Sequence, residues 1–152
     1  MEPKPPTPRA QRRALAAYVA LMRAAQRVTE RTHAHLAEHE LSVPQFAVLE
    51  ALLHVGPLSQ SALVNKVLCS PNNMTSVIDR LEARQLVERR VGRTDRRVRE
   101  VHLLPQGRAL IEGIFPTHAA GLTQELGRLK VNELEQLTRA CRALAAERGE
   151  TR

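Results

Sequence analysis

The stretch that decides the fold runs from Leu58 to Leu103 and reads LSQSALVNKVLCSPNNMTSVIDRLEARQLVERRVGRTDRRVREVHL. It predicts a helix, a turn, a second helix and then two short strands joined by a loop of arginines. The second helix should begin after Ser70, because a serine side chain can bond the free amides of a first turn, and Pro71 suits the first helical position. This helix should run to about Arg84.

The second helix has two contrasting faces. At about 100° of rotation per residue, its apolar residues gather on one face: Met74, Val77, Ile78 and Leu81. The opposite face carries only short or hydrogen-bonding side chains, namely Asn72, Ser76, Asp79, Arg80 and Ala83. A helix that buries one face and exposes another of this kind can lie in a DNA major groove and read base edges.

Two strands are predicted directly after this helix, over residues 86–91 and 98–103. The loop between them reads Gly92-Arg93-Thr94-Asp95-Arg96-Arg97. Like charges crowded at a hairpin tip repel one another unless something negative lies beside them, and a phosphate backbone would serve. A merely solvated turn is the alternative, but the neighbouring helix favours DNA contact. Helix, turn, helix and basic hairpin together predict a winged helix-turn-helix.

Helices are predicted on the N-terminal side of this stretch. Residues 10–38 contain no helix breaker and predict one long helix, with an apolar side made of Leu15, Tyr18, Val19, Met22, Ala25 and Leu36. The residues before it are rich in proline and predict a disordered basic arm. Ser42-x-x-Gln45 is a capping box that opens a further helix, which should end at Gly56-Pro57.

Helices are also predicted after the strands. Pro105 and Gly107 mark the start of a long one, and Asn132-x-x-Glu135 reads as a capping box for the last. The last helix repeats Leu134, Leu137, Cys141 and Leu144 at a spacing suited to helix packing. Because the end helices bury few residues against a small winged lobe, their apolar stripes need another partner. A second copy of the chain is the economical answer.

The expected fold is therefore mainly α with a small β-hairpin wing (α+β), a winged helix-turn-helix flanked by long dimerisation helices. We expect a disordered arm at residues 1–9, a DNA-binding lobe at residues 41–104, and a helical dimerisation region at residues 10–40 and 105–148.

Composition narrows the class of partner. The 152 residues suit one domain, and the net charge of +7 favours nucleic acid or an anionic membrane surface. Aromatic residues make up only 2% of the chain, too few for the platforms on which single-stranded bases stack, so duplex DNA is the predicted partner. No apolar run approaches the roughly 18 residues of a membrane span. With no secretory signal and no disulfide framework, we expect a cytoplasmic protein without a membrane partner.

The sequence also resembles a known family. The run Leu81-Glu82, Leu86-Val87-x-Arg89, Asp95-Arg96-Arg97-x-x-x-Val101-x-Leu103 and Gly107 is similar to the pattern of the MarR family of bacterial transcription regulators. The resemblance implies a homodimer whose end helices interlock, and a repressor function. It also implies that Asp95 orients the wing by pairing with Arg96 or Arg97. Three positions depart from the pattern: Gln85 replaces a glycine, Arg93 a wing proline and Leu104 a threonine.

Duplex DNA with a pseudo-palindromic operator is the expected partner, because a two-fold dimer presents two recognition helices. The residues expected to contact it are Ser70, Asn72, Asn73, Thr75, Ser76, Arg80, Arg93, Arg96 and Arg97. A small aromatic or acidic effector is expected to regulate binding, as the resemblance implies. Its expected pocket is basic and includes Tyr18, Arg23, His35 and His39.

Other site types have less support in the sequence. Cys69 lies where a helix dipole could activate a thiol, so a redox-responsive regulator of the same fold is an alternative. His35 and His39 stand one turn apart near His33, but no nearby ligand completes a tetrahedral set, so we expect no metal and no cofactor. Enzyme motifs are absent, and we expect no enzyme. A sequence-independent architectural DNA protein and a helical scaffold that binds no DNA are the remaining alternatives.

Overall fold

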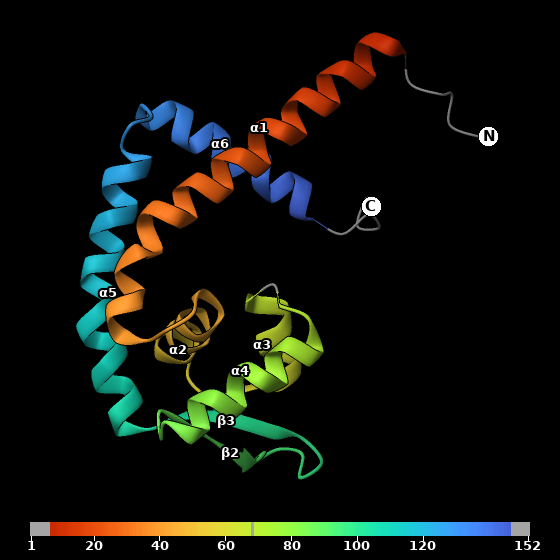
Figure 1. Cartoon of the computed structure of the whole chain (residues 1–152). Helices are drawn as coiled ribbons and strands as arrows, with labels where there is room; N and C mark the ends of the chain where they lie inside the picture. The colour runs from red at the N-terminus through yellow and green to blue at the C-terminus, as the bar shows by residue number, and fades with distance from the viewer. Residues whose placement is uncertain (1–6, 68, 147–152) are drawn as a thin grey trace, which may run out of the picture. The chain divides into compact units, whose positions relative to one another are not determined.

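The computed structural model describes residues 7–67 and 69–146 (Figure 1). Its elements in chain order are α1 (Pro8–His33), the 3-10 helix η1 (Ala34–His39), α2 (Val43–Val55), β1 (Leu58–Ser59), α3 (Gln60–Val67), α4 (Pro71–Ala83), β2 (Val87–Val91), β3 (Arg99–Leu103), α5 (Pro105–Leu126) and α6 (Val131–Ala145). This mainly helical chain with a small antiparallel sheet confirms the predicted fold class. Its described residues divide into a helical unit, residues 7–32 with 120–146, and a winged unit, residues 33–67 with 69–119.

The sheet of the winged unit has the order β1-β3-β2, with both pairs antiparallel. The hairpin of β2 and β3 places Arg89 opposite Val101. The sequence does not predict the strand β1, because two residues carry no periodic signal. Leu58 pairs with Val101, and the Ser59 hydroxyl then accepts a hydrogen bond from the Ala62 amide at 3.1 Å, so Ser59 also caps α3.

The core of the winged unit lies between its helices and the sheet. The predicted apolar face of α4 is buried in it, and α2 contributes Phe46, Val48, Leu49 and Leu52. Leu36 from η1 and Ile111 and Ile114 from α5 belong to the same core. This shared burial explains why the winged unit extends beyond residues 41–104 at both ends.

The first helix differs from the prediction at both ends. The Thr7 hydroxyl accepts from the Ala10 amide at 3.3 Å and α1 begins at Pro8, so the arm predicted for residues 1–9 is wrong for its last residues. Residues 1–6 lie outside the described part. The single helix predicted to Glu38 is also wrong, because α1 ends at His33 and η1 follows. The tighter 3-10 turns bury Leu36 to 2% exposure, so burial overrides helical propensity here.

The capping predictions have mixed outcomes. Ser42 and Gln45 form the predicted capping box, with Ser42 N–H donating to Gln45 Oε1 at 2.8 Å. The second predicted box, at Asn132 and Glu135, is wrong. α6 begins two residues earlier than that box requires, and Glu133 accepts from the Lys130 amide at 2.8 Å. Asn132 therefore lies inside the helix.

The described part of the helical unit leaves apolar side chains exposed. Leu15 and Tyr18 on α1 are 65% and 62% exposed, and Leu144 on α6 is 74% exposed. Glu125 is held by two arginines in this unit, accepting from Arg31 at 2.5 Å and from Arg128 at 2.7 Å. None of the described helices is long and apolar enough to cross a membrane.

Candidate nucleic-acid interface

The recognition helix α4 is built as the sequence predicts. The Ser70 hydroxyl accepts from the Asn73 amide at 3.3 Å, and Pro71 opens the first turn. At the other end Gln85 takes a left-handed conformation (φ 57°), and the Leu86 amide donates back to the Leu81 carbonyl at 3.0 Å. This reversal stops the helix and sends the chain directly into β2.

The outward face of α4 carries the predicted base-contacting residues, and all are exposed: Asn72, Asn73, Thr75, Ser76 and Arg80. Two of the predicted hydroxyls are already used within the protein. Ser70 caps the helix, while the Thr75 hydroxyl accepts from Gln60 Nε2 at 2.7 Å and donates to the Pro71 carbonyl at 3.3 Å. Within the described chain, Asn72, Ser76 and Arg80 make no side-chain hydrogen bond, so their polar groups are available to a ligand.

The wing tip exposes three arginines at the turn between β2 and β3: Arg93, Arg96 and Arg97. The turn is closed by its backbone, with Gly92 N–H donating to the Val98 carbonyl at 2.8 Å. Gly92 is required there, because a Cβ at this position would lie 2.7 Å from the Asp95 carbonyl oxygen.

Asp95 has a different contact from the one predicted. Its Oδ1 accepts a hydrogen bond from the backbone amide of Arg97 at 2.9 Å. Among the residues described, no ion pair joins Asp95 to Arg96 or Arg97, so the predicted guanidinium pairing is corrected to a backbone contact. Asp95 therefore shapes the turn and leaves both guanidiniums facing solvent.

Arg89 forms a hydrogen-bond network between β2 and α4 that no local sequence pattern predicts. Its guanidinium donates to the Glu82 carboxylate, to Asp79 Oδ1 at 2.7 Å and to the Thr75 carbonyl at 3.5 Å. Its backbone amide donates to Glu82 Oε1 at 2.7 Å. Glu82 and Arg89 both belong to the quoted family pattern, which was the available signal, but a pattern does not say which two residues meet.

Two further contacts hold α4 within the lobe. Gln60 joins it to α3 through Thr75, as given above. At the C-terminal end, Arg84 donates to the Glu40 carbonyl at 2.8 Å and to the His39 carbonyl at 3.1 Å. Figure 1 shows α4 beside the β2–β3 hairpin, and these contacts fix the helix against its neighbours.

The residues predicted to line an effector pocket fall in both units. Tyr18 is exposed on α1 in the helical unit. Arg23 lines a cavity of about 520 Å³ in that unit, together with Arg27, Arg31, Arg128 and apolar side chains of α5 and α6. His35 and His39 belong to the winged unit. The pocket itself remains a prediction.

His35 lies in a cluster of rings. Its ring centroid is 5.8 Å from that of His118, which in turn is 4.5 Å from Phe46. No group of three potential metal ligands occurs in the part of the chain that the structure describes. His39 contributes its backbone carbonyl to Arg84.

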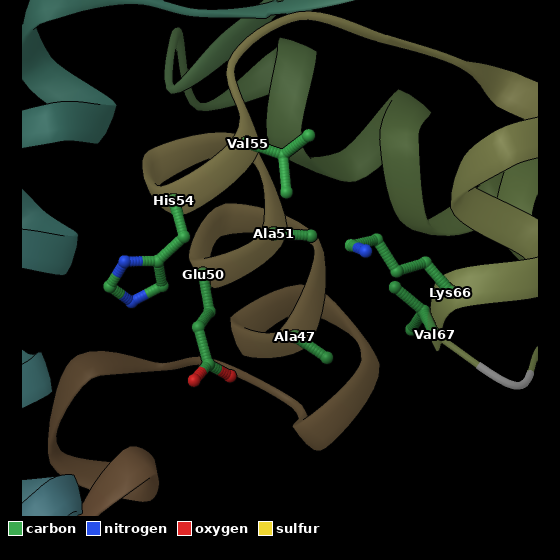
Figure 2. A pocket seen from close by; sticks show the side chains of 7 residues that line it. All are labelled: Ala47, Glu50, Ala51, His54, Val55, Lys66 and Val67. Atoms are coloured by element: carbon green, nitrogen blue, oxygen red, sulfur yellow. The ribbon is translucent and has the colours of Figure 1, made fainter.

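A second cavity, of about 240 Å³, lies between α2 and α3 (Figure 2). It is lined by Ala47, Glu50, Ala51, His54, Val55, Lys66 and Val67. Figure 2 shows the Lys66 amine reaching across toward Ala51, while Glu50 and His54 point away from Lys66. None of the predicted effector residues lines this cavity.

Both cysteines are free and half-buried. Cys69 packs against the core of the winged unit, and its amide donates to the Val64 carbonyl at 3.4 Å. Cys141 lies on α6. The redox alternative for Cys69 therefore remains a prediction.

Comparison with known proteins places this geometry in context. The model of the MarR family matches residues 41–98. The HTH-type transcriptional regulator MhqR of Bacillus subtilis is 32% identical over 126 residues, which cover 83% of this chain and 87% of MhqR. The HTH-type transcriptional repressor NicR of Pseudomonas putida is 30% identical, over 74% of this chain and 72% of NicR.

The solved structure of BpsR from Bordetella bronchiseptica is similar to this chain over most of the length of both proteins. The DNA binding of BpsR is regulated by 6-hydroxynicotinic acid. The TM-score is 0.76 at 30% sequence identity, and the match covers 84% of this chain and 91% of BpsR.

Proposed function

The chain belongs to the MarR family of DNA-binding transcription regulators, and from this premise we propose that it is a dimeric, sequence-specific repressor released from its operator by a small-molecule effector. Its relatives are transcription regulators and not enzymes. The observation that carries the proposal is the pairing of an open polar face on α4 with three exposed wing arginines.

Base reading is assigned to α4. Asn72 and Ser76 lie near the start of the helix and face outward, and an asparagine amide can pair with the N6 and N7 edge of adenine. Arg80 follows one turn later on the same face, and an arginine can bind the O6 and N7 edge of guanine. The helix therefore offers donors and acceptors suited to the major groove.

Phosphate binding is assigned to the wing. Arg93, Arg96 and Arg97 are exposed on a turn whose backbone is closed by hydrogen bonds. Guanidiniums held this way neutralise phosphates on either side of a groove and position the protein on the duplex. Ser70, Asn73 and Thr75 complete the proposed contact set near the start of α4.

Dimerisation is proposed through the helical unit. Exposed apolar residues on α1 and α6 are unusual for a monomer surface when they recur at helical spacing. A second copy would cover them and would place two recognition helices on a pseudo-palindromic operator, with half-sites about one helical turn apart.

Regulation by an organic anion is proposed from the relatives and the charge of the chain. 6-hydroxynicotinic acid regulates DNA binding of BpsR. In the helical unit, the cavity lined by Arg23, Arg27, Arg31 and Arg128 would suit the carboxylate of a small aromatic acid. Tyr18, His35 and His39 remain predicted effector contacts. An effector acts by favouring a spacing of the two recognition helices that no longer fits the operator.

A direct test uses fluorescence anisotropy with the DNA upstream of the protein's own gene and a shuffled duplex of the same composition. We expect tighter binding to the upstream duplex at every salt concentration, and weaker binding after 6-hydroxynicotinic acid is added. Equal affinity for both duplexes would identify a sequence-independent DNA protein. Failure to bind either duplex at low salt would exclude DNA binding.

A further inference from the structure

The contacts of Arg89 lie in a row along one edge of the recognition helix. Thr75, Asp79 and Glu82 are spaced four and three residues apart, so they follow one another along α4 over two turns. This edge separates the buried face, which includes Ile78, from the exposed face, which includes Ser76. The Arg89 guanidinium therefore forms hydrogen bonds along two turns of the helix, beside the surface proposed to read bases.

The residue that makes these hydrogen bonds belongs to the wing. Arg89 lies in the middle of β2, opposite Val101 of β3, and its side chain is only 22% exposed. Among the described residues, every side-chain hydrogen bond between α4 and the wing strands involves Arg89. The next residue, Arg90, faces the other way along the strand and pairs with Glu88 of its own strand.

Arg89 also balances charge on this surface. Asp79 is 59% exposed and Glu82 is 32% exposed, and both are carboxylates beside the proposed DNA-binding face. Three of the five N–H donors of the guanidinium are engaged by these carboxylates and by the Thr75 carbonyl, and the two carboxylates balance its charge, which disfavours a phosphate contact.

We infer that Arg89 is a positioning residue for operator recognition. It fixes the rotation of α4 about its own axis (its roll) relative to the wing, without touching DNA. The inference rests on the proposed function. The wing arginines anchor the protein on the phosphates, and the roll of α4 then decides whether Asn72 and Ser76 meet the intended base edges. A planar guanidinium with its donors in a fixed fork suits this task, because it binds several oxygens in one geometry.

The test compares Arg89→Gln with Arg90→Gln. Both changes remove one arginine charge from β2, but only the first removes contacts with α4. The probes are a duplex that the unmodified protein enriches from a random-sequence pool and a shuffled version of that duplex. Affinities are measured over a range of salt concentrations, and circular dichroism with thermal unfolding checks that each variant is folded.

We expect Arg89→Gln to lower the ratio of enriched to shuffled affinity by about tenfold, comparable to losing one good base contact, with the salt slope unchanged. Arg90→Gln should keep the ratio. A salt slope lower by about one unit in Arg89→Gln, with the ratio retained, would make Arg89 a phosphate ligand and overturn the inference. The inference is also overturned if Arg89→Gln keeps both the affinity ratio and the salt slope of the unmodified protein.

Glu82→Gln provides a second variant should Arg89→Gln fail to fold. It removes a negative charge near the DNA, so electrostatics alone would tighten binding to both duplexes equally and leave their ratio unchanged. Positioning predicts instead that the ratio falls, because Glu82 holds both the guanidinium and the amide of Arg89. A constant ratio overturns the inference. If the unmodified protein itself enriches no sequence from the pool, the proposed function fails before Arg89 is tested.

Discussion

Gly107 in the first turn of α5 lies against the carbonyl oxygen of Leu86. A Cβ at Gly107 would stand 2.0 Å from that oxygen, and the same oxygen accepts a hydrogen bond from the Leu104 amide at 3.0 Å. Backbone cannot move aside as a flexible side chain can. The contact therefore joins the residue just before β2 to the start of α5 through a position that only glycine can occupy.

Replacing Gly107 with alanine should destabilise the winged unit. The added methyl overlaps a backbone carbonyl, and overpacking of this kind costs about 1–3 kcal/mol of unfolding free energy. Gly113→Ala is the matched control on α5, because nothing lies within 4 Å of its added Cβ. The control should gain up to about 1 kcal/mol from helix propensity. Urea unfolding at one fixed protein concentration measures both, and equal effects would refute the close contact.

Replacing Gln85 with glycine should stabilise the end of α4. Gln85 has a φ of 57°, a region that costs most side chains about 1–2 kcal/mol but not glycine. Part of that gain is offset by the greater freedom of glycine in the unfolded chain, which leaves about 0.5–1 kcal/mol. Thermal unfolding should show a higher Tm for Gln85→Gly and little change for Gln85→Ala. A lower Tm for the glycine variant would mean that the Gln85 side chain itself stabilises this turn.

A charge on α6 should disrupt the proposed dimer. Leu137 is 40% exposed on this helix, and Leu137→Asp would bury a carboxylate in an apolar interface at a cost of several kcal/mol. Gln136→Asp places the same charge one residue away on the exposed side of α6. Sedimentation velocity should detect monomers for the first variant and dimers for the control. A dimeric Leu137→Asp that still binds DNA would locate the interface elsewhere.

Substitutions in the recognition helix and in the wing should change DNA binding in different ways. Asn72→Ala combined with Ser76→Ala removes proposed base contacts, each worth about 1–3 kcal/mol of discrimination, so the operator-to-shuffled affinity ratio should fall at a constant salt slope. Arg96→Ala removes a proposed phosphate contact, so both duplexes should weaken alike and the slope should flatten by about one unit. Titration of each variant at several salt concentrations separates the two. Loss of the ratio at constant slope in Arg96→Ala would mean that the wing reads sequence.

Glu125 should make stability depend on acidic pH. Hydrogen bonds from Arg31, and then from Arg128, lower the pKa of this carboxyl below its ordinary value of 4.5. The unfolded chain therefore takes up the proton first as pH falls, so the stabilising contribution is complete above about pH 5 and is lost as pH falls through the lowered pKa.

The measurement is the difference in Tm between the unmodified protein and Glu125→Gln from neutral pH to pH 3. The unmodified protein should be the more stable at neutral pH, and the difference should shrink toward pH 3. Glu135→Gln is the control, because Glu135 has no ion pair within the described residues. A difference that stays constant with pH would show that the carboxylate charge of Glu125 contributes nothing.

The sequence by itself determined the recognition helix α4 and the wing. Ser70, Pro71 and the apolar repeat from Met74 to Leu81 define α4 through local capping and helical periodicity, and the structure has the helix over Pro71–Ala83. The arginine loop between two strand signals likewise defines the wing. Both signals are local, since a cap, a period and a turn need only neighbouring residues.

Tertiary structure decided where the chain departs from local preference. α1 ends at His33, although its residues favour a longer helix, because Leu36 is buried in the core of the winged unit. The strand β1 exists because Leu58 and Ser59 meet β3, some forty residues away in sequence. Arg89 finds Thr75, Asp79 and Glu82 only after α4 and β2 have packed together. These features depend on contacts between residues distant in sequence, which no period or local motif encodes.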